Sequence, residues 1–189
     1  MSGPESAITL ATCPVDIVEL AAFRERASDL ARLAARRDIV LAGPGATAAH
    51  SGRLTLSVRP DRWLLLMPPA APGASAEHCR QLCEGSAAAV DLSSALAAFL
   101  LTGPTVPEML ARACRLDLET RAFPAGRAAA TILVQVPAIL AQLAAGTLLL
   151  TPTTTARHLH EWLVETARPF GLALAPDATV SALCAEAST

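Results

Sequence analysis

Two cysteines and a histidine that lie close together in the sequence are the first residues whose chemistry needs an explanation. Cys79 and Cys83 are four positions apart, and His78 precedes the first of them. On a helix this spacing puts both thiols on one face, where they could form a redox pair or bind a metal ion. A structural zinc site needs a complete tetrahedral ligand set, and no second pair lies nearby in the sequence. We therefore favour packing of two small side chains on one helix face.

Cys114 is the second candidate nucleophile, and His158 or His160 would be its base. Nothing in the sequence brings the thiol and the imidazoles together. Cys114 follows the apolar face of a predicted helix, which favours core packing. His158 and His160 are two positions apart on another predicted helix, so they point in different directions and at least one should reach solvent or an interface.

Asp91 and Asp117 each stand between apolar neighbours, which is the setting of a candidate general base or folate contact. The simpler interpretation, which we favour, is a turn carboxylate that accepts backbone N–H bonds. The sequence contains no pattern typical of a phosphate-binding loop. Neither Gly43-Pro44-Gly45 nor Gly103-Pro104 has the spacing of a dinucleotide fingerprint, and a chain without Lys has no Walker lysine.

The elements around these residues alternate between strand and helix patterns. Residues 54–58 alternate with period two, residues 63–67 are continuously apolar, and the turn between them predicts a hairpin. The spacing of apolar residues predicts an amphipathic helix over residues 21–37, a short helix over 77–84 and a final helix from Thr153 or Thr154 to about residue 170. Thr105 and Glu108 form a capping-box pattern for a helix that should run to about Arg115. Further strands are expected at 15–20, 87–92, 96–101 and 128–135. The fold class is therefore α+β, with antiparallel hairpins.

Composition limits the partners that this chain can have. Of its 189 residues 52% are hydrophobic, and the mean hydropathy of +0.42 is high for a soluble domain, so we expect a large core and some surface covered by a partner. Aromatic residues make up only 3% and the net charge is −2, which argues against nucleic-acid binding.

The composition and the apolar pattern also predict where the chain is located. Polar residues and Pro137 interrupt the most apolar stretch, residues 132–150, so a membrane span is not expected. No signal peptide is expected at the N-terminus, and five scattered cysteines favour a reducing cytoplasm.

Four ordered segments between about residues 53 and 171 carry a family signature. They are Arg59–Leu65; Val90–Ser93 with Leu101–Pro104; Cys114–Leu118 with Arg121–Gly126; and His160–Leu163 before Phe170–Gly171. In this order and spacing they resemble the gamma subunit family of heterotetrameric sarcosine oxidase.

The resemblance implies a fold of two small antiparallel sheet-and-helix lobes, similar to the folate-binding domains of the glycine-cleavage aminomethyltransferase. It also implies an accessory chain with no catalytic, cofactor-binding or metal residues of its own. Its partners would be an alpha subunit with dinucleotide and folate sites, a flavin-bearing beta subunit and a zinc-binding delta subunit. FAD, FMN, NAD, tetrahydrofolate and zinc would therefore lie on the partners. The complex would demethylate sarcosine or a related N-methyl amine, releasing formaldehyde or methylene-tetrahydrofolate.

These observations lead to specific expectations for the chain. We expect a flexible segment at residues 1–12, a domain at 13–175 with sub-lobes at about 13–86 and 87–175, and a C-terminal tail at 176–189. The candidate interface residues are Trp63, His158, His160 and Phe170, whereas the periodicity around Trp162 favours the core. Two alternatives stay open: a standalone folate-binding protein related to aminomethyltransferase, and a small thiol enzyme that uses Cys114 or Cys79.

Overall fold

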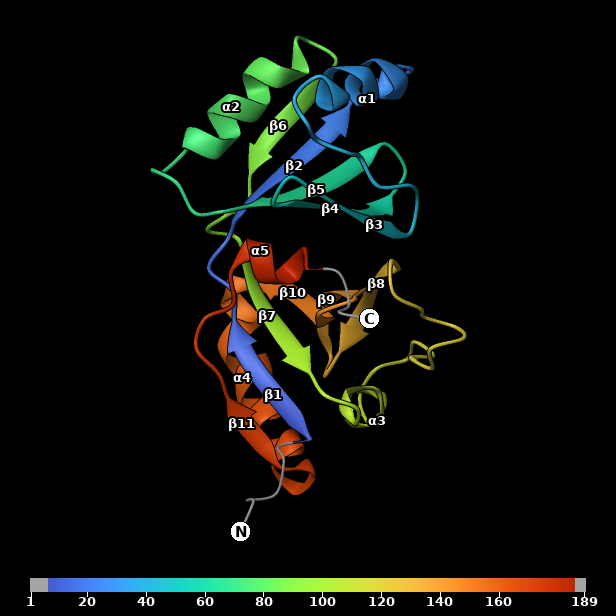
Figure 1. Ribbon diagram of the computed structural model, residues 1–189, viewed down its shortest axis with the longest axis vertical. Helices are drawn as coiled ribbons and strands as arrows, with labels where there is room; N and C mark the ends of the chain where they lie inside the picture. Colours follow the sequence, from blue (N-terminus) through green and yellow to red (C-terminus); the bar gives the residue numbers. More distant parts are fainter. Residues whose placement is uncertain (1–6, 186–189) are drawn as a thin grey trace.

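Two β-sheets lie face to face in the computed structural model, and helices cover the outer face of each sheet (Figure 1). The structure describes residues 7–185. The N-terminal sheet has the order β3-β4-β5-β2-β6, with strands β2 Asp16–Ala22, β3 Ala46–His50, β4 Arg53–Arg59, β5 Arg62–Met67 and β6 Ala87–Asp91. The C-terminal sheet has the order β11-β1-β7-β10-β9-β8, with strands β1 Ile8–Thr12, β7 Leu96–Thr102, β8 Ala128–Leu133, β9 Val136–Leu143, β10 Gly146–Pro152 and β11 Leu172–Leu174.

The described helices are α1 Ala27–Ala35, α2 Ala74–Cys83, α3 Val106–Ala111, α4 Thr153–Ala167, the 3-10 turn η1 Arg168–Phe170 and α5 Val180–Leu183. Helix α5 lies between the two sheets, where Leu183 joins the apolar layer (Figure 1). Helices α1 and α2 pack on the N-terminal sheet, whereas α3 and α4 pack on the C-terminal sheet. The α+β class is thereby confirmed. Within residues 7–185, no helix combines the length and the sustained hydropathy that crossing a bilayer requires.

Burial on both faces explains why the central strands are continuously apolar. In β5, Leu64 and Leu66 point into the layer between the sheets, whereas Leu65 and Met67 point toward α1 and α2. In β10, Leu149 likewise faces α3 and α4. Successive strand residues point to opposite faces, so a strand covered on both sides needs an apolar residue at every position. The hairpin expected from residues 54–67 is confirmed as the β4–β5 pair.

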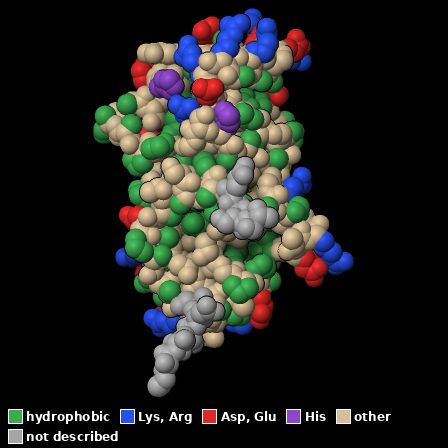
Figure 2. Space-filling view, viewed as in Figure 1, with side chains coloured by type: hydrophobic (Ala, Val, Ile, Leu, Met, Phe, Trp, Pro, Cys, Tyr) green, Lys and Arg blue, Asp and Glu red, His purple; other side chains and the backbone are tan. Residues whose placement is uncertain are grey.

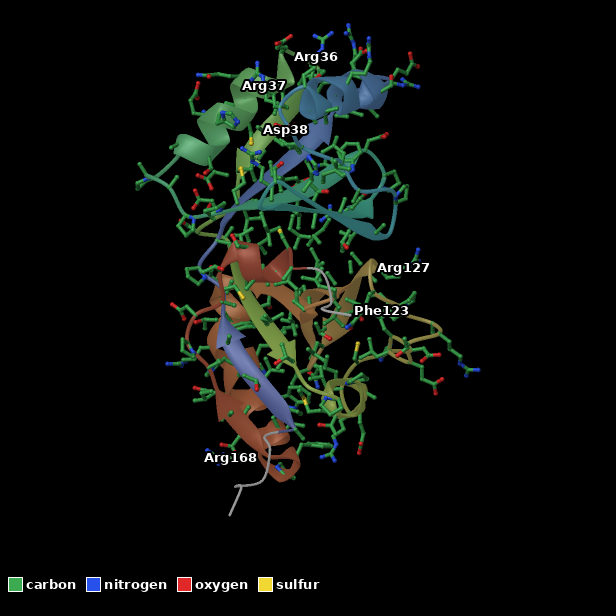
Figure 3. The ribbon with its side chains drawn as sticks, viewed as in Figure 1. Arg36, Arg37, Asp38, Phe123, Arg127 and Arg168 are labelled. Atoms are coloured by element: carbon green, nitrogen blue, oxygen red, sulfur yellow. The ribbon has the colours of Figure 1, made fainter. Side chains whose placement is uncertain are left out.

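Backbone hydrogen bonds join the two sheets at one corner. The Ala128 N–H donates to the Gly45 carbonyl at 2.9 Å, and the Thr47 N–H donates to the Gly126 carbonyl at 2.8 Å. Arg127 lies at this junction between β3 and β8 (Figure 3). The sheets are therefore linked by main-chain contacts as well as by the apolar layer between them.

Both ends of the chain differ from the sequence-based expectation. Residues 8–12, expected to be flexible, form β1, because Ile8 and Leu10 are buried in the core beneath α4. The expected tail contains α5, where the Thr179 hydroxyl accepts a hydrogen bond from the Ala182 N–H and Leu183 fills the inter-sheet layer. Residues 1–6 and 186–189 lie outside the described part of the chain.

The boundary expected at residues 86 and 87 also differs from the sheet membership. Strand β6, which follows that boundary, pairs with β2 in the N-terminal sheet. Strand β1 pairs with β7 and belongs to the C-terminal sheet. The chain therefore starts in one sheet, builds the other and then returns. A boundary drawn at one position in the sequence does not describe this arrangement.

Two of the expected helices are shorter in the structure. The helix expected over residues 21–37 begins at Ala27, because Ala21 and Ala22 still pair with β6. The helix after Thr105 ends at Ala111, and its capping box does not form. Instead, the Thr105 hydroxyl donates to the Ala7 carbonyl at 3.2 Å and ties the start of α3 to the segment before β1.

Candidate functional site

The paired thiols of α2 are buried under the helix, in an environment that keeps them unreactive. Cys79 and Cys83 are 0% and 1% exposed and pack against the N-terminal sheet, whereas His78 is on the exposed side of the same helix. Burial raises the pKa of the Cys79 thiol to about 12, and the neighbouring Cys83 adds to the effect. Burial also raises the pKa of Cys83. Both thiols therefore stay protonated at neutral pH, which suppresses nucleophilic and metal-binding chemistry.

We expect these two thiols to resist alkylation in the folded chain. Iodoacetamide at pH 8 should leave Cys79 and Cys83 unmodified, because only the thiolate reacts and both thiols are buried with raised pKa values. Peptide mass spectrometry after a timed reaction measures this. A parallel reaction in concentrated guanidinium chloride should label all five cysteines. Rapid labelling of Cys79 in the native chain would show that α2 does not protect it.

Cys114 and the two histidines do not form a catalytic pair. The Cys114 Sγ lies 3.8 Å from the Thr131 Oγ1, beside the edge strand β8. His160 lies on α4 with its ring centroid 5.7 Å from that of Phe99, and His158 is exposed on the same helix. In the part of the chain that the structure describes, neither imidazole hydrogen bonds to the Cys114 thiol.

The carboxylates of Asp91 and Asp117 stabilise exposed turns by accepting backbone hydrogen bonds. The Asp91 carboxylate accepts a hydrogen bond from the Ser93 N–H at 2.9 Å, and that of Asp117 accepts one from the Glu119 N–H at 3.0 Å. Hydrogen bonds from the side chain and then the backbone of Ser93 lower the pKa of Asp91. A general base needs the opposite shift at neutral pH. Among residues 7–185, no three His, Cys, Asp or Glu side chains come together to hold a metal ion.

The structure places the four interface candidates in two separate regions. Trp63 lies on β5 and is half-buried, and its indole N–H donates to the Ala42 carbonyl at 2.8 Å. His158 and His160 lie on α4, and the half-buried Phe170 follows in η1. The guanidinium carbon of Arg112 stands 4.6 Å above the centre of the Phe170 ring. Trp162 is half-buried and packs against the core beneath α4.

Exposed apolar side chains on the edge strands are candidate partner contacts that were not predicted from the sequence. Val90 on edge strand β6 is 48% exposed, and Ile132 and Leu174, on the two edge strands of the C-terminal sheet, are 56% and 64% exposed. Edge strands carry unpaired backbone groups and normally bear charges that prevent further pairing. The run Ala87–Val90 has no charged residue, and this is the feature of the sequence that could have indicated a surface covered by a partner. Its recognition as an edge required the sheet order.

Charge is distributed unevenly over the surface. Figure 2 shows Arg, Asp and Glu side chains gathered over α1 and α2, whereas the middle of the same face is largely uncharged. Arg36, Arg37 and Asp38, after α1, belong to the charged end (Figure 3). The uncharged middle coincides with the level at which the two sheets meet (Figure 1).

The four-layer arrangement defines the class of fold. It is similar to that of the glycine-cleavage aminomethyltransferase T from Bartonella henselae, with a TM-score of 0.65 and 11% identity over 95% of this chain and 50% of that chain. A chain of the heterotetrameric sarcosine oxidase from Corynebacterium sp. U-96 is more similar, with a TM-score of 0.77 and 24% identity over 90% of this chain and 89% of that chain. At these identities the two likenesses establish the fold.

Sequence comparison then gives the family. The model of the sarcosine oxidase, gamma subunit family matches residues 24–167, and this chain belongs to that family. A sarcosine oxidase subunit gamma from Arthrobacter sp. is 34% identical over 92 residues, covering 49% of this chain and 45% of the relative. The one from Corynebacterium sp. (strain P-1) is 29% identical over 120 residues, covering 63% of this chain and 59% of the relative. The matched region thus spans about half the length of these curated relatives.

Proposed function

We propose that this chain is a noncatalytic structural subunit of a cytoplasmic, flavin-containing complex of the sarcosine oxidase type. The complex oxidatively demethylates sarcosine or a related N-methyl amine and releases formaldehyde or methylene-tetrahydrofolate. Its other chains are alpha, beta and delta subunits, which carry FAD, FMN, NAD, tetrahydrofolate and zinc. The observation that carries the proposal is the family match over residues 24–167.

The chemistry of the described residues supports a structural role. The paired thiols are buried and protonated, Asp91 has a lowered pKa, and no base contacts Cys114 in the described part of the chain. Most apolar side chains form the core, but Val90, Ile132 and Leu174 are exposed on edge strands, where a partner can cover them. A permanent interface of this kind buries on the order of 2,000 Å² or more.

We propose that His158, His160 and Phe170 contact a partner at the surface formed by α4 and η1. His158 is exposed and is free of any ion pair within residues 7–185. His160 and Phe170 are half-buried, so a partner can cover the remainder of each ring. Trp63 is a second proposed contact, on the N-terminal sheet. Its indole N–H also stabilises the fold through the hydrogen bond to the Ala42 carbonyl.

Co-expression with neighbouring genes tests the assembly. A tagged form of this chain should bring down a yellow, flavin-containing complex, whereas the chain produced alone should aggregate at high concentration, because its apolar margins are then exposed to water. Flavin absorbance and the subunit pattern of the purified sample are the measurements. Replacing His158 with Asp should lower the yield of complex, because it puts a negative charge into the proposed contact. Replacing Arg157, which is 92% exposed on the same helix, with Gln is the matched control.

Other results would contradict this proposal. A chain that stays monomeric at high concentration and brings down no flavoprotein would count against a structural subunit. The alternative of a standalone folate-binding protein requires that the purified chain bind tetrahydrofolate by itself. Calorimetric titration should detect no such binding. Tight binding would favour the alternative over the proposal.

A further inference from the structure

An apolar cavity of about 140 Å³ lies between the two sheets, close to the β4–β5 turn. The N-terminal sheet contributes Leu56 and Leu64 to its lining, and the C-terminal sheet contributes Leu96 and Ile139. An engineered apolar protein cavity of about 150 Å³ binds benzene. The space between the sheets is therefore large enough for a body the size of one aromatic ring.

A β-bulge determines which charges reach this cavity. Leu56 pairs with Leu64, and Arg59 pairs with Arg62, so β4 has one more residue than β5 between these two pairs. Unbroken alternation from Leu56 would turn Arg59 toward the helix-covered face of the sheet. The extra residue instead puts Arg59 on the same side as Arg62 and Leu64, which is the inter-sheet side. Both arginines accordingly line the cavity.

The two guanidinium groups at the rim have one carboxylate between them. Glu19, which also lines the cavity, forms an ion pair with Arg62. Arg59 forms no ion pair within 4.0 Å with any residue between 7 and 185. Like charges directly opposite each other destabilise a strand pair. Arg59 therefore holds uncompensated positive charge beside an apolar space, which is a suitable combination for an amphipathic anion.

We propose that this cavity binds a small monocarboxylic acid whose apolar body is about the size of a benzene ring. The body packs against Leu56, Leu64 and Ile139. At the rim, the carboxylate accepts hydrogen bonds from Arg59, because guanidinium groups bind carboxylates in a bidentate geometry. The ligand supplies the negative charge that the Arg59–Arg62 pair lacks. A neutral molecule of the same shape gains the apolar contacts but not these hydrogen bonds.

Benzoate and benzyl alcohol are matched probes for this site. The chain has two tryptophans, and Trp63 stands between the lining residues Arg62 and Leu64 on β5, with its indole packed on the helix-covered side. Replacing Trp162 with Phe therefore makes Trp63 the single fluorescent reporter, one strand residue away from the cavity, in the full chain. At a concentration too low for aggregation, benzoate should change the Trp63 emission saturably. It should bind about tenfold or more tightly than benzyl alcohol, because the alcohol lacks the ionised carboxylate that accepts two hydrogen bonds from the Arg59 guanidinium. Thermal unfolding with the same probes is the second measurement, because a ligand that binds the folded state raises the Tm.

Three variants separate the contributions to binding. Arg59→Gln should weaken benzoate by about tenfold and leave benzyl alcohol unchanged. Ile139→Phe should abolish binding of both probes by filling the cavity. Arg157→Gln, far from the cavity on α4, should change neither affinity. Equal affinities for the two probes, an unchanged benzoate affinity in Arg59→Gln, or no saturable response in either measurement would overturn the proposal.

Discussion

Replacing Gly103 with Ala is expected to lower the free energy of unfolding by about 3 kcal/mol or more, and the Tm by roughly 6–12 °C. Gly103 has a φ of +125°, and a Cβ atom built there would lie 2.0 Å from the Ala7 carbonyl oxygen. That atom belongs to backbone, so no side-chain rotation can relieve the clash. The segment before β1 would have to separate from the end of β7, to which β1 is paired.

Gly43 provides the matched control for this substitution. Its φ lies outside the left-handed region, and no heavy atom lies within 4 Å of a Cβ built there. Gly43→Ala should therefore change the free energy of unfolding by no more than about 1 kcal/mol. Thermal and urea unfolding of both variants supply the comparison. Equal stabilities would mean that β1 is not held against Gly103 in solution, and the docking of β1 in the C-terminal sheet would then be wrong.

Replacing Leu148 with Ala should destabilise the chain by about 2–5 kcal/mol, because it opens a cavity between the two sheets. Leu148 lies on β10, between β7 and β9, and is 0% exposed in the inter-sheet layer. The buried cluster that contains Leu148 draws residues from both sheets, among them Leu54, Leu66 and Leu100. The loss should therefore weaken the contact between the sheets as well as the C-terminal sheet itself.

Leu174 on β11 allows the same chemical change at an exposed position. This side chain is 64% exposed, so Leu174→Ala should alter the free energy of unfolding by no more than about 0.5 kcal/mol. Urea unfolding monitored by circular dichroism measures both variants. A separate unfolding transition of one sheet in Leu148→Ala would show that the sheets can come apart. A loss as small as that of Leu174→Ala would contradict close packing between them.

Most strands could be located from the sequence, whereas their pairing could not. The run 63–67 predicts a central strand, because a strand buried on both faces needs apolar residues throughout, and it became β5. Strands β6 and β7 follow each other in sequence, yet the segment Leu92–Ala95 carries the chain from one sheet to the other. Strand β1 was missed because its partner β7 is far away in the sequence, and local polarity gave no indication of it.

Among the candidate site residues, some placements could be predicted from the sequence and others could not. Periodicity alone placed Cys79 and Cys83 on one buried helix face, and the interpretation of Asp91 and Asp117 as turn carboxylates agrees with their bonds to Ser93 and Glu119. The exposed margins at Val90, Ile132 and Leu174 were not predicted, because a strand becomes an edge only when the sheet order is known.

The amino-acid sequence by itself predicted the class of fold and the packing of Cys79 and Cys83 on one helix face, because both depend on local patterns of apolar and polar residues. The family was predicted from the resemblance of four ordered segments. Only the tertiary structure decided that β1 belongs to the C-terminal sheet and that Arg59 faces the space between the two sheets. The second result depends on a single extra residue in β4. A one-residue change in register turns a side chain to the other face, and register is set by contacts between strands rather than within them.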